Sequence, residues 1–176
     1  RRNNGGSYGV DLNRNYGPYA YWNAPNGGSS TSPTSDTYRG TAPFSEPETT
    51  NLKNFVAARY FKNALNYHTY SNLLIYPYGA LGQETPDSAI FREFARDMTA
   101  YNGYTYGTDL QTVGYSTRGN SDDYFYDGDT LSNHGKIFAM TPEVGSTGFW
   151  PSQPEIFPLA IENVLPNLYY AYVAGE

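Results

Sequence analysis

The sequence predicts an α/β fold, in which a mixed β-sheet is flanked by two or three helices. Helical periodicity follows Ser45 and again spans residues 86–102. Short apolar runs at residues 73–76 and 136–140 have the length and composition of buried strands. Strand and helix patterns that alternate in this way favour a sheet covered by helices, with about four strands. At 176 residues the chain suits one domain, and we assign residues 1–176 to it.

The composition excludes several classes of protein. A formal net charge of −6 argues against nucleic-acid binding, which depends on clustered Lys and Arg. No apolar run reaches the length of a membrane span, and no signal-peptide pattern is present. With no cysteine, a zinc ion would need His, Asp or Glu ligands. Low charge together with 19 Tyr favours an extracellular, secreted protein.

The first candidate site lies near the N-terminus. Residues 1–8 are polar and Gly-rich and predict a loop, and Asp11, Asn13 and Arg14 then crowd into four positions. An arginine beside an asparagine amide can hold a carboxylate at two points. The alternative is a surface turn with solvated polar groups. Residues 17–41 predict a long loop, of a length that usually has a function.

The first long helix is expected to begin at Ser45. Ser45 and Glu48 have capping-box spacing, with Pro47 tolerated in the first turn. Apolar residues then recur at roughly helical spacing. They are Leu52, Phe55, Val56 and Phe61.

A strand expected at residues 64–69 is followed by the apolar run at 73–76. His68 lies at the end of this strand, and Pro77 and Gly79 close the unit with a turn. Because functional groups gather at strand ends, His68 is a candidate metal ligand or acid/base. The alternative is a structural histidine among aromatic residues.

The second half of the chain contains a helix, an irregular stretch, a strand and a final helix. The helix at 86–102 is expected to bury Ile90, Phe91, Phe94, Met98 and Tyr101 and to end at Gly103. Residues 104–129 look irregular. The strand at 136–140 leads to Glu143, whose pKa partial burial would raise towards that of a general base. A terminal helix at 154–173 is expected to bury one apolar face and to kink or divide at its prolines. That face comprises Ile156, Leu159, Ile161, Val164, Leu168 and Tyr172, and the prolines are Pro158 and Pro166.

Four motifs, in this order along the chain, resemble the zinc carboxypeptidases of the carboxypeptidase A, B and T group. They are GVDLNRNY, NYHTYSNLLIYPYG, GYSTRGNSDDYFY and KIFAMTPEVGSTGFWP. The resemblance implies a zinc-dependent exopeptidase that acts on the C-termini of peptides or proteins. It also implies cis peptide bonds at Thr69–Tyr70 and Pro77–Tyr78.

The resemblance assigns a role to each matching residue. His68 matches a zinc ligand, and Glu143 matches the general base that later donates a proton to the leaving amine. Asn13 and Arg14 match the pair that grips the terminal carboxylate of the substrate. Asp11 matches an aspartate that orients another zinc histidine.

Three further positions concern the substrate side chain and its neighbours. Tyr115 matches a mobile tyrosine that closes over the terminal carboxylate, and Tyr70 matches a tyrosine of the neighbouring subsite. Asp122 resembles the pocket-base aspartate of the carboxypeptidase B branch, which pairs with a C-terminal Lys or Arg. The alternative for Asp122 is an Asx turn in a loop.

The chain departs from the family pattern in its metal ligands. The His-x-x-Glu motif that supplies two zinc ligands is absent, so we expect these ligands, and the N-terminal strands of the sheet, upstream of Arg1. Arg1 and Arg2 lie near the position of the family's oxyanion arginine, but neither matches it. His134 matches no ligand and is expected at the surface. The chain alone should therefore bind zinc poorly and show little activity.

Two other functions stay open at this point. One is a related zinc amidohydrolase that acts on peptidoglycan peptides, which assays on cell-wall stem peptides would distinguish. The other is a non-catalytic module that binds peptide or sugar through its Tyr-rich loops. For such a module, replacing Glu143 with Gln would leave function intact.

Overall fold

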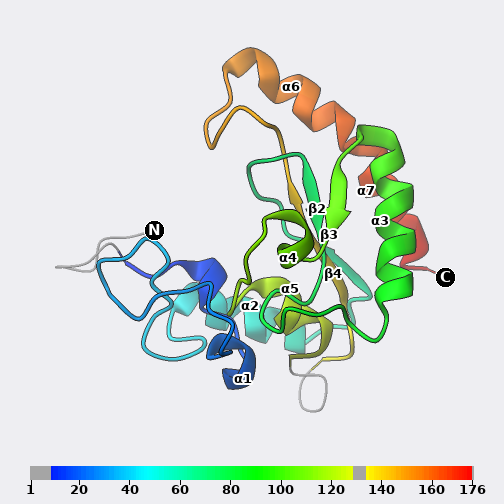
Figure 1. The fold of residues 1–176 in the computed structure, drawn as a ribbon. Helices are drawn as coiled ribbons and strands as arrows, with labels where there is room; N and C mark the ends of the chain where they lie inside the picture. The colour runs from blue at the N-terminus through cyan, green and yellow to red at the C-terminus, as the bar shows by residue number, and fades with distance from the viewer. Residues whose placement is uncertain (1–8, 129–133, 176) are drawn as a thin grey trace.

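The computed structural model describes residues 9–128 and 134–175 (Figure 1). The predicted loop at residues 1–8, with Arg1 and Arg2, lies outside the described residues. Within these limits the predicted architecture is confirmed: helices flank a mixed sheet of four strands.

The sheet is organised around its last strand. Its strands are β1 (Asn63–Leu65), β2 (Leu73–Ile75), β3 (Thr105–Gly107) and β4 (Phe138–Glu143), in the order β1-β4-β2-β3. The first half of β4 pairs in parallel with β1, and its second half pairs antiparallel with β2. β4 is therefore three residues longer towards the C-terminus than its apolar run predicts, since β2 supplies hydrogen-bond partners for the continuation.

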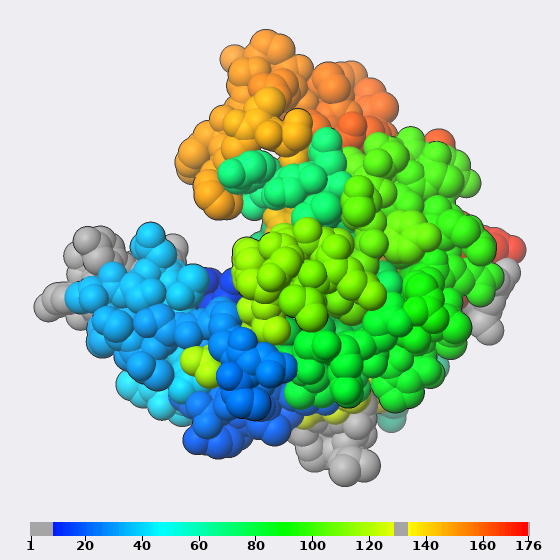
Figure 2. Space-filling model, viewed as in Figure 1, coloured from blue at the N-terminus to red at the C-terminus, as the bar shows by residue number. Residues whose placement is uncertain are grey.

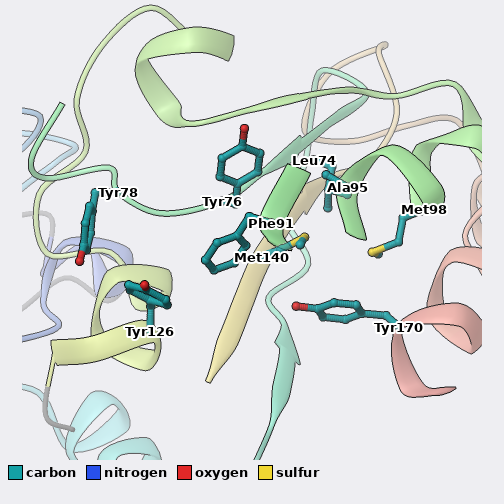
Figure 3. Close-up of a cluster of buried hydrophobic side chains, with 9 residues drawn as sticks. All are labelled: Leu74, Tyr76, Tyr78, Phe91, Ala95, Met98, Tyr126, Met140 and Tyr170. Carbon is teal, nitrogen blue, oxygen red and sulfur yellow. The ribbon is translucent and has the colours of Figure 1, made fainter. Parts of the chain in front are cut away.

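Helices cover both faces of this sheet. Met140 packs with Phe91 and Met98 of α3 (Ser88–Asn102) and with Tyr170 of α7 (Val164–Val173) on one face. Figure 3 shows Tyr170 reaching from α7 towards Met140, with Tyr78 and Tyr126 together at the other end of the cluster. Ala139 points to the opposite face, in a second cluster that includes residues of α2 (Pro47–Ala57). Successive side chains of β4 point to opposite faces of the sheet, so this strand contributes to both hydrophobic clusters.

The start of α2 differs from the sequence prediction. Glu46, not Ser45, is the N-cap residue, and its own side chain accepts no capping hydrogen bond. The Ser45 hydroxyl instead donates to Glu46 Oε1 at 2.8 Å and accepts from Asn15 Nδ2 at 2.9 Å. The helix ends at Ala57, so Phe61 packs on it from the following loop. The capping-box prediction is wrong because the buried Asn15 side chain competes for the serine.

α3 confirms the second predicted helix and its C-terminal glycine. Gly103 adopts the left-handed conformation with φ of 72° and donates its amide to Thr99 O. Phe91 and Met98 are buried, as expected, but Ile90 and Tyr101 are 38% and 53% exposed. The buried stripe is narrower than predicted: its apolar members are Phe91, Ala95 and Met98, spaced three or four residues apart.

The terminal helix is divided, although not at a proline. α6 (Gln153–Glu162) and α7 meet at Asn163, while Pro158 lies inside α6 and Pro166 in the first turn of α7. The predicted buried face is wrong for most of its residues. α6 extends past the end of the sheet (Figure 1) and buries no residue fully. The exposed members of that face are Ile156, Ile161, Val164, Leu168 and Tyr172.

Short elements punctuate the loops. They are η1 (Leu12–Arg14), α1 (Tyr19–Trp22), α4 (Asp109–Thr112), α5 (Ser121–Asp123) and η2 (Tyr124–Gly128). In the part of the chain that the structure describes, every helix is too short or too polar to cross a bilayer.

Candidate functional site

The C-terminal end of β4 brings His68 and Glu143 together. The His68 amide donates to Pro142 O at 2.9 Å, and the Val144 amide donates to His68 O at 2.9 Å. This pairing keeps the β1–β4 register to three residues beyond the end of β1 and fixes His68 beside Glu143. Glu143 is the last residue of β4, opposite Leu73, and not a residue beyond the strand as the sequence predicts. The position of Glu143 is therefore fixed by the backbone pairing of β4 with β2.

Asn13 and Arg14 reach the same region from η1. The Asp11 carboxylate accepts from the Asn13 amide at 3.1 Å and so caps this single turn. The Asn13 side-chain oxygen accepts from the Ser121 amide at 3.3 Å, which ties η1 to the start of α5. Figure 2 shows a hollow between the blue N-terminal segments and the orange α6 region, with the deep blue of the first described residues at its base.

The long loop at residues 17–41 positions the Arg14 guanidinium. Arg14 Nε donates to Gly28 O at 2.7 Å, and Nη1 donates to Asn13 O at 2.8 Å. Gly28 has φ of +86°, and a Cβ there would lie 1.9 Å from Ser116 O. Only glycine therefore allows this carbonyl to approach the guanidinium. The alternative of a solvated surface turn at Asp11–Arg14 is wrong.

Five of the seven predicted site residues line one small cavity of about 60 Å³: Asn13, Arg14, Tyr115, Asp122 and Glu143. This volume is well below that of the pockets that enclose drug-sized ligands. The other lining residues are Ile75, Asp109, Val113, Thr117, Asn120 and Thr141.

His68 opens onto an adjoining cavity of about 310 Å³ that also contacts Asn13. Its Nε2 lies 3.1 Å from Asn66 Nδ2. Burial, and then the charge of Arg14, lower the pKa of His68, so its imidazole is neutral near pH 7. Tyr70 lines neither of these cavities. It is 40% exposed, and its ring packs edge-on against Phe149 at 5.1 Å.

The small cavity gathers carboxylates around one guanidinium. Burial raises the pKa of Asp122 and of Glu143 to about 7 each, and that of Asp109 to about 6. The charge of Asp109 raises the first two further, and Arg14 lowers the pKa of Glu143. Among the described residues, Glu143 Oε2 is buried without a hydrogen-bond partner. The carboxylates of the cavity therefore favour binding of either a proton or a cation.

Two other positions correct the sequence predictions. Asp122 is not in a surface Asx turn: it lies in α5, is 5% exposed, and its Oδ2 accepts from Thr141 Oγ1 at 2.6 Å. His134 is buried, not at the surface, and packs edge-on against Tyr124 at 5.1 Å. The expected cis bonds at Thr69–Tyr70 and Pro77–Tyr78 are confirmed.

Sequence reasoning missed Asp109, Thr117 and Asn120. They belong to the stretch at 104–129 that carries no periodicity, because its elements are only three to five residues long. No local signal marks Asp109. The sequence signal for Asn120 is its place two residues before Asp122, where its side chain caps α5 by accepting from the Asp123 amide at 2.9 Å.

The buried Asp122 carboxylate should destabilise the folded state at high pH. Its pKa in the folded protein, about 7, lies above its ordinary value of 3.8, so folding favours the protonated form. The penalty is absent below pH 4, grows between pH 4 and 7, and is constant above that range. Asp122→Asn, whose amide oxygen still accepts from Thr141, should be more stable than the parent at pH 8, by up to about 4 kcal/mol. Urea denaturation of both proteins from pH 4 to 8 measures this difference, and a variant less stable at pH 8 would refute it.

The sheet and the cavity at its edge define an α/β protein in which an arginine, an asparagine amide and buried carboxylates line one cavity. The chain belongs to the zinc carboxypeptidase family, whose model matches residues 1–165. Carboxypeptidase A1 of Rattus norvegicus is 34% identical over 172 residues, which cover 91% of this chain and 38% of that protein. Carboxypeptidase B of the same species is 35% identical over 151 residues, 81% of this chain and 34% of that protein.

The fold comparison agrees with the family. The structure of bovine thrombin-activatable fibrinolysis inhibitor, in complex with tick carboxypeptidase inhibitor, superposes with a TM-score of 0.81 at 25% identity. It covers 99% of this chain and 60% of that one. The chain spans over a third of the length of the curated relatives it matches.

The zinc that the family implies needs more ligands than the described residues offer. A catalytic zinc takes three protein ligands, and no group of three or more His, Asp or Glu side chains among the described residues is placed to hold a metal. His68 suits a single ligand position, since its imidazole is neutral near pH 7. The described residues therefore do not form a zinc site by themselves.

Proposed function

We propose that this chain is part of the catalytic domain of a zinc metallocarboxypeptidase, which hydrolyses the C-terminal peptide bond of peptides or proteins. The observation that supports this function most is the shared cavity of Asn13, Arg14 and Glu143. In this cavity an arginine and an asparagine, which suit a carboxylate ligand, lie beside a carboxylate that suits a general base. The family of the chain supplies the reaction class.

Arg14 and Asn13 grip the terminal carboxylate of the substrate. The guanidinium is fixed by Gly28 O and Asn13 O, so part of its donor fork is already oriented. A free carboxylate satisfies the remaining donors in two-point fashion. Because an internal peptide bond has no such group, this contact makes the enzyme an exopeptidase.

Glu143 is the general base. Its raised pKa suits proton transfer near neutral pH, and its buried Oε2 has no hydrogen-bond partner among the described residues. The carboxylate takes a proton from the attacking water and returns it to the leaving amine. Tyr115, 56% exposed at the cavity, closes over the bound carboxylate, and Tyr70 contacts the preceding substrate residue.

Asp122 gives the pocket a preference for C-terminal Lys or Arg. A fully buried carboxylate without a cation partner is best satisfied by a cationic side chain. Hydrolysis rates of matched peptides that end in Lys, Leu and Phe test both proposals on the zinc-loaded protein that contains this chain. Cleavage of the Lys peptide at least tenfold faster supports the preference. A clear preference for Phe removes it, and no cleavage of any free-carboxylate peptide removes the function.

A polypeptide of residues 1–176 alone should bind zinc weakly and show little activity. His68 is the one residue that we assign as a ligand, and one imidazole does not hold zinc tightly. Isothermal titration of the 176-residue polypeptide with zinc measures the affinity. A submicromolar Kd, retained in His68→Ala, would show that other residues form a site.

We also propose that the enzyme acts outside the cell. The low fraction of charged residues, 16%, and the many Tyr, Gly and Asn side chains support this location. Its partners are then peptide or protein C-termini. Detecting the protein in the culture medium of its source, rather than in the cell pellet, tests the proposal.

A further inference from the structure

A second buried carboxylate, Asp109, lines the same cavity as Asp122. Asp109 is the first residue of α4 and is 7% exposed, while Asp122 comes from α5 and is 5% exposed. The two acids reach the cavity from separate elements, and Arg14 and Glu143 line it as well. The cavity therefore holds more negative charge than a single specificity aspartate provides.

The surroundings of Asp109 hold its carboxylate in place. The Thr117 hydroxyl hydrogen-bonds to it, and Thr117 Oγ1 accepts from Asn120 Nδ2 at 2.9 Å. Gly79 lies directly against this group, and a Cβ there would come within 2.4 Å of Asp109 Oδ2. Neutral donors and a glycine thus position the carboxylate without neutralising its charge.

The cavity is lined by fewer cationic side chains than acidic ones. Arg14 is the one cationic side chain among the described residues that line the cavity, and the proposed function assigns it to the substrate carboxylate. Asp109, Asp122 and Glu143 all line the cavity, and the charge of Asp109 raises the pKa of Asp122. Glu143 Oε2 also lacks a partner among the described residues. These observations indicate that a cation from outside completes the site.

We propose that Asp109 is a second specificity-determining residue, which acts with Asp122 to select a C-terminal arginine over a C-terminal lysine. The proposal rests on the proposed carboxypeptidase function. A guanidinium is planar and carries five N–H donors along two edges, so it can pair with two carboxylates from different elements at once. A lysine ammonium is a compact point charge that one carboxylate and water satisfy. The second acid therefore adds more binding energy for arginine than for lysine.

The test compares peptides that differ only in a C-terminal Arg, Lys or Leu, on the zinc-loaded protein that contains this chain. Asp109→Asn should lower kcat/KM for the Arg peptide at least tenfold, and for the Lys and Leu peptides less than threefold. Asp122→Asn should lower it for both basic peptides. Asp97→Asn, which removes a charge outside the cavity, should leave the Arg-to-Lys ratio unchanged. A ratio that stays the same in Asp109→Asn overturns the proposal.

The ratio of kcat/KM for the Arg peptide to that for the Lys peptide separates a change in specificity from the other effects of Asp109→Asn. Loss of the Asp109 charge also acts on Glu143, but this alters all three substrates equally and cancels in the ratio. If Asp109→Asn does not fold, as judged by its thermal melt, Thr117→Val removes the hydroxyl that holds the carboxylate. That variant should shift the ratio in the same direction, and an unchanged ratio counts against Asp109.

A binding measurement keeps this inference distinct from the proposed function. Titration with free L-arginine and L-lysine should give at least tenfold tighter binding of arginine to the parent, and a loss of that difference in Asp109→Asn. If no peptide is cleaved but this pattern holds, the carboxypeptidase function fails and the two-carboxylate site stands. If peptides are cleaved but arginine and lysine bind equally, the function stands and the role of Asp109 is refuted.

Discussion

Glu143→Gln in the zinc-loaded protein that contains this chain should lower kcat/KM for its best peptide roughly 10²- to 10⁴-fold. Glutamine has nearly the same shape as glutamate, so β4 and its pairing with β2 should be unaffected. The amide cannot accept a proton at neutral pH, so water activation and proton return to the amine are both lost. The affinity for a product such as a free amino acid should change far less, because we assign the binding of its carboxylate to Asn13 and Arg14.

Steady-state kinetics and product titration together measure this separation. Glu48→Gln, in the first turn of α2 and outside the cavity, is the matched control and should retain full activity. A Glu143→Gln protein within tenfold of the parent would contradict the general-base role. A protein that binds peptide without cleaving it, with the same affinity in Glu143→Gln as in the parent, would instead favour the non-catalytic binding module.

The position of Glu143 illustrates what the sequence does and does not predict. The apolar run at 136–140 indicates a buried strand, and the acid after it is visible as a candidate. The extension of β4 to Glu143 is not visible, because it depends on pairing with β2, about 70 positions earlier in the chain. Hydrophobic periodicity reports burial within a segment, whereas strand ends are set by a partner strand.

The residues that line the cavity are also only partly predictable from the sequence. Asn13, Arg14, Tyr115, Asp122 and Glu143 belong to motifs that the sequence displays, and the structure brings them together. Asp109 belongs to no motif. Its importance arises from burial, from the absence of a side chain at Gly79, and from the approach of α5, none of which has a local signature.

The function of the long loop at residues 17–41 is likewise only partly predictable from the sequence. Its length alone predicts a function, and its composition does not say which one. The structure supplies the answer at Gly28, whose carbonyl holds Arg14 Nε in a backbone conformation that a residue with a Cβ could not adopt there. The loop therefore positions the guanidinium that we propose as the receptor for the substrate carboxylate.

Arg14→Ala should weaken kcat/KM for peptides with a free C-terminus by about 2–5 kcal/mol, which is roughly 30-fold to several thousand-fold. The terminal carboxylate of the substrate would enter the cavity without a charged partner and near three acids. Arg14→Lys restores the charge but not the fork that Gly28 and Asn13 orient, so it should recover only part of this loss.

A matched pair of substrates isolates the contact. A peptide amidated at its C-terminus has no carboxylate for Arg14 to hold, so the parent should cleave it poorly and Arg14→Ala should slow it little further. The difference between free and amidated peptides is then the contribution of the guanidinium, measured in one protein background. If Arg14→Ala lowers kcat/KM for the free peptide less than tenfold, the substrate carboxylate is held elsewhere. Because the exopeptidase assignment depends on this one contact, that outcome would leave Glu143 a base without a defined scissile bond.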